Sequence, residues 1–179
     1  FVRYQAETLS DVMAMSLDGD RRPTAILATR ANEAYPEFSP DGRYLAYVSD
    51  DSRTNEVYVQ PYPGPGRREK ISNAGGSEPA WSQGGGELFY WMSTDSRRRM
   101  MAVPITTKPT FKVLGAPQQL FEGRYGSQAL VRGYDVTADG QRFYFVQHKE
   151  RPPVRATQMI LVQNWFEELK AKVPGGVAK

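Results

Sequence analysis

Short runs of alternating apolar and polar residues, separated by turn-forming residues, follow one another along most of this 179-residue chain. Such runs predict β-strands, because successive side chains of a strand point to opposite faces of its sheet. Long apolar helical runs are missing, and no segment approaches the roughly 20 apolar residues that a membrane-spanning helix needs. The pattern therefore predicts an all-β fold.

One phrase occurs three times, at residues 38–47, 81–90 and 136–145. In each copy an aromatic or β-branched residue precedes a turn, and alternating apolar residues follow it. The turns contain Gly42, Gly85 and Gly140. Glycine readily adopts the left-handed backbone conformation that returns the chain into a second antiparallel strand. Each copy therefore predicts a β-hairpin.

A second phrase follows the first two hairpins at residues 55–61 and 99–104, and residues 11–16 repeat it without a hairpin before it. Val12 and Val57 are 45 positions apart, Val57 and Met101 are 44 apart, and Gly42 and Gly85 are 43 apart. Fourth strands are predicted at residues 23–27, 69–72 and 118–121. A period of about 40–45 residues with about four strands is typical of a β-propeller blade.

The repeats predict a partial β-propeller over residues 1–163, with blades at about 1–29, 33–72, 77–121 and 132–163, and a short C-terminal helix and tail at 164–179. Residues 1–6 match a second strand without a first, and the last blade, which includes residues 159–162, has no evident fourth strand. The chain thus holds about three and a half blades, fewer than the four of the smallest closed ring. Blades bury apolar faces only against other blades, so we expect two copies to associate, or the segment to fold only within a longer ring.

The interval between the turn glycines lengthens toward the C-terminus. Gly85 and Gly140 are 55 positions apart, which is 12 more than the preceding interval. The extra residues are predicted to lie in loops at residues 108–117 and 123–132. Long loops on a rigid scaffold often determine binding specificity.

Residues 39–50 together with 55–59 resemble the TolB-like repeat, a propeller blade related to the WD-type repeat that lacks its Trp-Asp signature. The segments 17–21, 60–66, 81–90 and 134–143 are similar, more narrowly, to propeller tails of bacterial serine/threonine kinases. The resemblance extends from about Phe1 to Lys172. It implies the C-terminal part of a six-bladed propeller that follows a kinase domain and sometimes a membrane helix. It leaves open the extracytoplasmic side of a membrane-anchored kinase and the cytoplasm.

Catalytic signatures are missing from the sequence. Residues 75–79 come closest to the Gly-x-Ser-x-Gly elbow of hydrolases and fail at the last position. There is no phosphate-binding loop, kinase catalytic phrase, cysteine or zinc-binding histidine pair, and His148 is the only histidine. We therefore predict that this chain itself is not an enzyme and needs neither cofactor nor metal.

The first strand of each propeller blade lines the central channel. Six residues on or just before these strands are predicted to surround one channel mouth and to bind a ligand: Glu33, Tyr35, Glu78, Trp81, Arg132 and Tyr134. Aromatic side chains with a few charges suit a peptide or ligand pocket. The alternative is that the three aromatic residues simply pack between blades.

The predicted function is a non-catalytic binding or sensing module with a protein or peptide partner. Two other classes stay open. A hydrolase or lyase would draw its catalytic residues from several blades at the channel. A polyanion-binding surface would use the clusters at Arg21, Arg67 and residues 97–99, although the net charge of +3 is spread over turns and no nucleic acid is expected.

Overall fold

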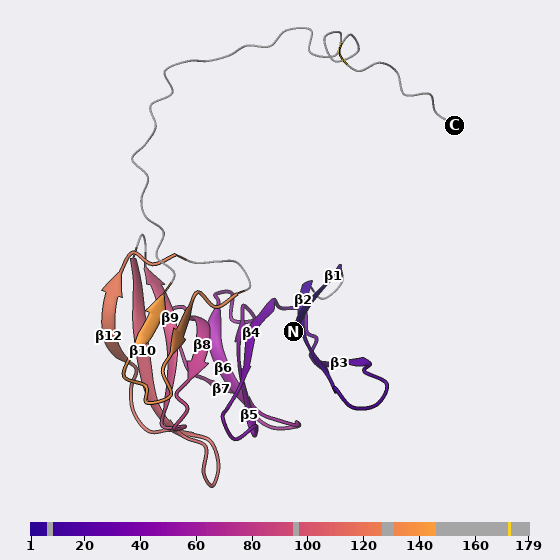
Figure 1. Ribbon diagram of the computed structural model, residues 1–179, viewed down its shortest axis with the longest axis horizontal. Helices are drawn as coiled ribbons and strands as arrows, with labels where there is room; N and C mark the ends of the chain where they lie inside the picture. The colour runs from indigo at the N-terminus through magenta and orange to yellow at the C-terminus, as the bar shows by residue number, and fades with distance from the viewer. Residues whose placement is uncertain (7–8, 95–96, 127–130, 146–171, 173–179) are drawn as a thin grey trace. The chain divides into compact units, whose positions relative to one another are not determined.

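The computed structural model describes residues 1–6, 9–94, 97–126, 131–145 and 172 (Figure 1). The chain divides into two units, Phe1–His148 and Lys149–Lys179, and nearly all described residues belong to the first. His148, the strand predicted at residues 159–162 and, apart from the helical Lys172, the helix predicted at 164–179 lie outside the described residues. Within the described part of the chain, no helix has the length and hydropathy to cross a bilayer.

The described strands form four antiparallel sheets, in each of which every strand after the first pairs with the strand before it in sequence, except that β12 pairs with β10 (Figure 1). The first sheet contains β1 (Val2–Gln5), β2 (Leu9–Met15) and β3 (Pro23–Leu27). The second contains β4 (Glu33–Phe38), β5 (Tyr44–Ser49), β6 (Glu56–Pro61) and β7 (Glu69–Lys70). The third contains β8 (Ser77–Trp81), β9 (Glu87–Thr94) and β10 (Arg97–Thr106), with β11 (Lys112–Val113) and β12 (Gln118–Gly123) both paired to β10. The fourth contains β13 (Tyr134–Val136) and β14 (Phe143–Phe145).

The three turn glycines lie in three different sheets, as the repeat requires. Their φ angles are 70° at Gly42, 69° at Gly85 and 71° at Gly140, a conformation that side-chain-bearing residues rarely adopt. In each turn the glycine N–H donates to the carbonyl three residues earlier, at 2.8, 2.9 and 2.8 Å. The predicted hairpins are therefore confirmed, and the three copies share one backbone geometry.

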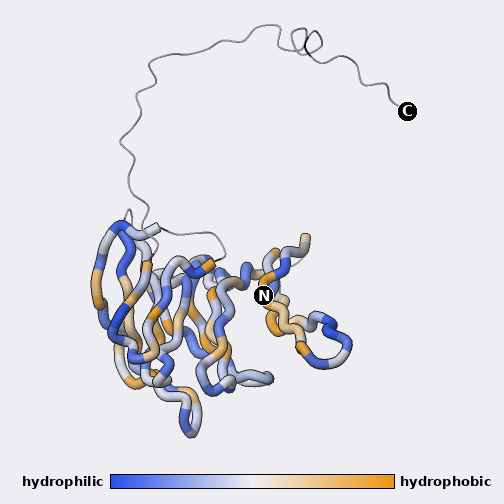
Figure 2. The backbone as a smooth tube through the Cα atoms, viewed as in Figure 1, coloured by the Kyte–Doolittle hydropathy of each residue, from blue (hydrophilic) through white to orange (hydrophobic). Residues whose placement is uncertain are grey.

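The central strands of the second and third sheets bury both of their faces. Along β5, Leu45 and Tyr47 pack toward the first sheet, whereas Ala46 and Val48 pack toward the third. Hydrophobic positions lie mainly along the strands, and the loop between β2 and β3 is hydrophilic (Figure 2). Each sheet thus covers its neighbour in the sequence, which is how stacked propeller blades form a core.

The third sheet is the centre of this packing. Leu88 and Tyr90 of β9 join the core shared with the second sheet, and Phe89 and Trp91 join the aromatic core shared with the fourth. Trp91 contacts four aromatic rings in that core: Phe121, Tyr125, Tyr134 and Phe145.

The loop predicted at residues 108–117 folds back onto the second sheet. Arg43 donates to the carbonyl of Pro109 at 2.7 Å, and the N–H of Phe111 donates to the hydroxyl of Tyr44 at 2.8 Å. The Phe111 ring packs edge-on against Trp81. This part of the insertion fastens two sheets together, while Leu114 at its end is 63% exposed.

Candidate functional site: a hollow at the innermost strands

The first strands of the sheets border one hollow of about 930 Å³. All four sheets contribute to its wall. The lining residues are Phe1, Val2, Tyr4, Tyr35, Pro36, Glu37, Pro79, Val131, Arg132, Gly133, Tyr134, Asp135, Tyr144 and Phe145. We call this feature the inner hollow. Aromatic and proline side chains form most of its wall, and Glu37, Arg132 and Asp135 supply the charged side chains.

Three of the six predicted site residues line the inner hollow: Tyr35, Arg132 and Tyr134. Tyr134 is 5% exposed and also packs in the core between the third and fourth sheets, and Tyr35 is partly buried against the core between the second and third. Tyr35 and Tyr134 therefore pack between blades, as the alternative interpretation expects, and also form part of the wall of the hollow.

The other three predicted residues are buried and lie outside the lining of the hollow. Glu33 is 1% exposed, and its Oε1 accepts from the hydroxyl of Thr29 at 2.5 Å. Burial raises the pKa of Glu33. Trp81 is 2% exposed, and its indole N–H donates to the carbonyl of Glu37 at 3.1 Å. A residue's place on a first strand thus does not decide whether it faces the channel or the neighbouring blade.

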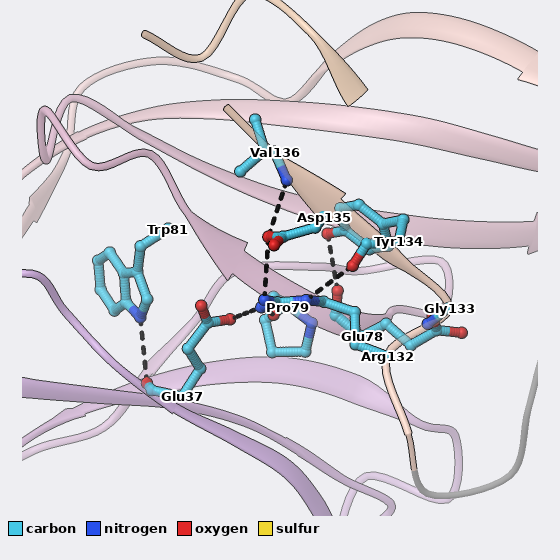
Figure 3. A network of polar contacts seen from close by, with 9 residues as sticks. All are labelled: Glu37, Glu78, Pro79, Trp81, Arg132, Gly133, Tyr134, Asp135 and Val136. Atoms are coloured by element: carbon cyan, nitrogen blue, oxygen red, sulfur yellow. Dashed lines mark hydrogen bonds and ion pairs between the residues drawn. The ribbon is translucent and has the colours of Figure 1, made fainter. Parts of the chain in front are cut away.

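Glu78 fastens the fourth sheet to the third. Its Oε1 accepts from Arg98 at 2.5 Å. Its Oε2 accepts from the N–H of Gly133 at 2.7 Å, and its carbonyl accepts from the hydroxyl of Tyr134 at 2.8 Å (Figure 3). The Arg98 guanidinium also lies 4.7 Å from the centre of the Trp91 ring. The Glu78 carboxylate is 0% exposed and both of its oxygens accept hydrogen bonds, so it has a structural role.

Two of the first strands carry the same backbone irregularity. The pairing register shifts between Ala34 and Glu37 in β4, and between Ser77 and Ala80 in β8. Inside each bulge a non-glycine residue that precedes proline has a φ of 52°: Tyr35 and Glu78. Bulges re-aim side chains beside functional sites, and strained backbone of this kind persists where the surroundings hold it.

Arg132 is the centre of the polar network in the inner hollow (Figure 3). Its Nη1 contacts Glu37 Oε2 and donates to the carbonyl of Pro79 at 3.3 Å, and its Nε donates to the carbonyl of Tyr134 at 3.0 Å. Its Nη2 reaches Asp135 Oδ1 at 3.4 Å. One guanidinium therefore connects the second, third and fourth sheets.

Sequence reasoning missed the two carboxylates of this network, although the repeat contains a signal for them. Glu37 and Asp135 each lie five positions before a turn glycine, Gly42 and Gly140. The shared offset suggests a shared side of the blade, but it is not sufficient, because Ala80 lies five positions before Gly85 and is buried in the core between the third and fourth sheets. Tyr144 was missed because it lies on a second strand.

Burial raises the pKa of Glu37 from 4.5 to about 7, against the opposing effect of the adjacent Arg132 guanidinium. The lining residues include no serine, threonine, cysteine, lysine or histidine within the described part of the chain. Over the same residues, no group of three or more histidine, cysteine or acidic side chains is arranged to hold a metal ion. The arrangement is suited to hydrogen bonding, ion pairing and aromatic contact.

Carboxylates pair with one arginine in each of the first two clusters and with all three arginines at residues 97–99. Ion pairs join Arg22 to Asp20, Arg68 to Asp51, and both Arg97 and Arg99 to Glu122. The expectation that these charges are spread over turns is wrong for residues 97–99, which lie in β10, and the Arg98 side chain there is 9% exposed. These pairs weaken the polyanion alternative.

Comparison with known proteins gives partial matches. No family model matches the chain. It is 44% identical over 52 residues to the Tol-Pal system protein TolB of Pseudomonas aeruginosa and 45% identical over 51 residues to that of Thioalkalivibrio sulfidiphilus. These matches cover 29% and 28% of this chain and 12% of each TolB protein. A putative tricorn protease homolog 2 of Streptomyces coelicolor is 41% identical over 59 residues, which are 32% of this chain and 5% of that protein.

Solved structures extend the likeness. A putative TolB from Agrobacterium tumefaciens superposes with a TM-score of 0.57 at 18% identity, covering 68% of this chain and 44% of that one. TolB from Acinetobacter baumannii gives 0.53 at 16% identity, covering 85% and 46%. The chain thus spans less than half the length of either structure, and the likeness concerns the fold. Repeat phrases, stacked antiparallel sheets and these superpositions together show that the chain is a TolB-like β-propeller segment.

Proposed function

We propose that this chain is a non-catalytic interaction module that binds an extended segment of a partner protein in the inner hollow. The observation that supports this most is the composition of the wall, where four tyrosines, two phenylalanines and two prolines accompany three charged side chains: Tyr4, Tyr35, Tyr134, Tyr144, Phe1, Phe145, Pro36, Pro79, Glu37, Arg132 and Asp135. Rigid aromatic anchors with few, well-placed polar groups are typical of peptide and protein interfaces.

The wall is also held in place before a ligand arrives. Arg132 is fixed by Glu37 and by two backbone carbonyls, and the bulges that contain Tyr35 and Glu78 lie within paired strands. Tyr4 and Tyr144, each 62% exposed, offer ring surface to a ligand. A preformed surface loses little conformational entropy on binding, which favours affinity.

A propeller hydrolase or lyase is the rival function, and one observation favours it. Glu37 has a pKa of about 7, a property that suits a general acid or base. Against it, the carboxylate of Glu37 is in an ion pair with Arg132, and the described lining residues contain no side-chain nucleophile of the serine, threonine, cysteine or lysine type. The match to the tricorn protease homolog spans 5% of that protein and transfers no activity.

A kinase-linked origin is part of the proposal. It is supported by the resemblance of residues 60–66 and 134–143 to the propeller tails of bacterial serine/threonine kinases. In such a protein the module would sense a partner on behalf of the kinase. The coding sequence upstream of Phe1 tests this directly, because a kinase catalytic phrase there supports the assignment and its absence removes it.

The binding site itself is tested by replacing one exposed ring. Peptides selected on the immobilised chain from a random library should bind Tyr144→Ala about tenfold more weakly than the unaltered chain, as measured by isothermal titration calorimetry. Leu114→Ala is the matched control, because Leu114 is 63% exposed and lies outside the inner hollow. Selected peptides that bind both variants with unchanged affinity would place the interaction elsewhere.

A further inference from the structure

We propose that the inner hollow selects a basic segment and places a lysine or arginine side chain of the partner against the carboxylate of Asp135. This inference rests on the proposed function, since it names the chemistry of the segment that the hollow binds. It is argued from the charges, exposures and rings of the lining residues.

Asp135 is the most exposed charged side chain of the hollow, although its Oδ1 accepts from the N–H of Val136 at 2.9 Å and from Arg132. Arg132 is 27% exposed and has three oxygen partners besides Asp135: Glu37 Oε2 and the carbonyls of Pro79 and Tyr134. Its contact with Asp135 is longer, at 3.4 Å, and the Asp135 side chain is 72% exposed. Two carboxylates thus share one guanidinium that is already well satisfied, so the lining side chains carry excess negative charge above pH 7, where Glu37 is ionised.

Aromatic rings surround this charge. Tyr144 and Tyr4 are each 62% exposed in the wall, and Tyr35 and Phe145 are partly exposed. The hollow already contains a cation beside a ring, because the Arg132 guanidinium lies 5.7 Å from the centre of the Tyr134 ring. A second cation placed among exposed tyrosines and next to a carboxylate gains from both interactions.

The same groups disfavour an acidic ligand. A carboxylate or phosphate entering the hollow would lie beside Glu37 and Asp135, and it would have to replace existing oxygen partners of Arg132. Like charges at such distances are repulsive, and a buried partner that is displaced loses its hydrogen bonds. The hollow therefore discriminates against acidic peptides and against nucleic acids.

The test uses three fluorescent peptides whose common sequence is selected for binding to the full chain. They differ at one position, which is arginine in the first, the neutral and similarly shaped citrulline in the second, and glutamate in the third. Fluorescence anisotropy should show the arginine peptide binding roughly fivefold more tightly than the citrulline peptide, and the glutamate peptide binding most weakly. Asp135→Asn should abolish the preference for arginine over citrulline. Added salt should reduce the same preference on the unaltered chain, a measurement that does not depend on the folding of any variant.

Asp20→Asn provides the matched control. Asp20 is 69% exposed, is paired with Arg22, and lies outside the inner hollow, so its loss should leave the preference intact. Equal binding of the arginine and citrulline peptides to the unaltered chain overturns the basic preference. If Tyr144→Ala still lowers the affinity for both peptides in that case, binding in the inner hollow is upheld. Peptides insensitive to both Tyr144→Ala and Asp135→Asn overturn the proposed function as well.

Discussion

Glu37 and Asp135 occupy the same position in the first and third copies of the repeat, yet their environments differ. Burial raises the pKa of Glu37 to about 7 although the neighbouring Arg132 lowers it, whereas the Asp135 side chain is 72% exposed. The fourth sheet lies against one neighbour in the described chain, and this leaves Asp135 in contact with solvent. Both residues line the inner hollow, but the sequence offset determines neither this place nor the burial, because Ala80 at the same offset lies in the core between the third and fourth sheets.

The raised pKa of Glu37 makes stability depend on pH. Between pH 4.5 and about 7 the folded protein holds a proton on Glu37 that the unfolded chain has released. This contribution to stability is therefore fully present below pH 4.5 and is lost as the pH rises through about 7. Between about pH 5 and pH 8, the unfolding free energy of the unaltered chain should fall by an extra amount on the order of 1–3 kcal/mol because of Glu37. Glu37→Gln should lack this part of the fall, as measured by urea unfolding.

The exposed Glu69 provides the comparison for this titration. Glu69→Gln should retain the pH dependence of the unaltered chain. Parallel pH profiles for Glu37→Gln and the unaltered chain would show that Glu37 is not buried as described.

At the scale of elements, the hairpins were predictable because glycine, proline and aspartate mark their turns locally. In two of the three turns an aspartate accepts from a nearby hydroxyl and from a following N–H: Asp41 from Ser39 and Arg43, and Asp139 from Thr137 and Gln141. Gly84 occupies the equivalent position of the remaining turn. There the hydroxyl oxygen of Ser82 accepts from the N–H of Glu87 at 3.1 Å.

Restoring the aspartate should stabilise this turn. Gly84 has no positive φ, and an added Cβ meets no atom within 4 Å, so Gly84→Asp fits without strain and reduces the freedom of the unfolded chain. We expect a gain of about 0.5–1 kcal/mol in unfolding free energy, measured by urea titration. Gly85→Asp should instead destabilise, because the φ of Gly85 is 69°. Destabilisation by both substitutions would contradict the turn equivalence.

Elements without a local signal were not predictable. β11 is formed by Lys112 and Val113 inside the inserted loop and pairs with the end of β10 through Ile105 and Thr106. The bulges at Tyr35 and Glu78 likewise depend on pairing with β5 and β9, although the following prolines mark an irregular strand. Such features depend on contacts between distant segments. The sequence pattern predicts which strands exist, but not the register in which they pair.

For the whole described molecule, the repeat predicted how the sheets stack, and the sizes of their interfaces became visible only in the structure. The interface between the second and third sheets buries twelve hydrophobic residues, and the interface between the first and second buries four. In a stack, stability is approximately a sum of the sheets and their nearest-neighbour interfaces. The first sheet should therefore open before the second and third separate.

Two equivalent leucines test this order. Leu45 and Leu88 are 43 positions apart, are 1% and 0% exposed, and each packs toward the preceding sheet. Leu88→Ala should lower the global unfolding free energy by about 2–5 kcal/mol, because it opens a cavity in the largest interface. Leu45→Ala should chiefly remove amide-exchange protection from β2, and leave that of β9 close to its original value. Equal loss of protection in β2 and β9 for both variants would mean that the sheets unfold as one unit. The small interface between the first and second sheets would then not be the first to open.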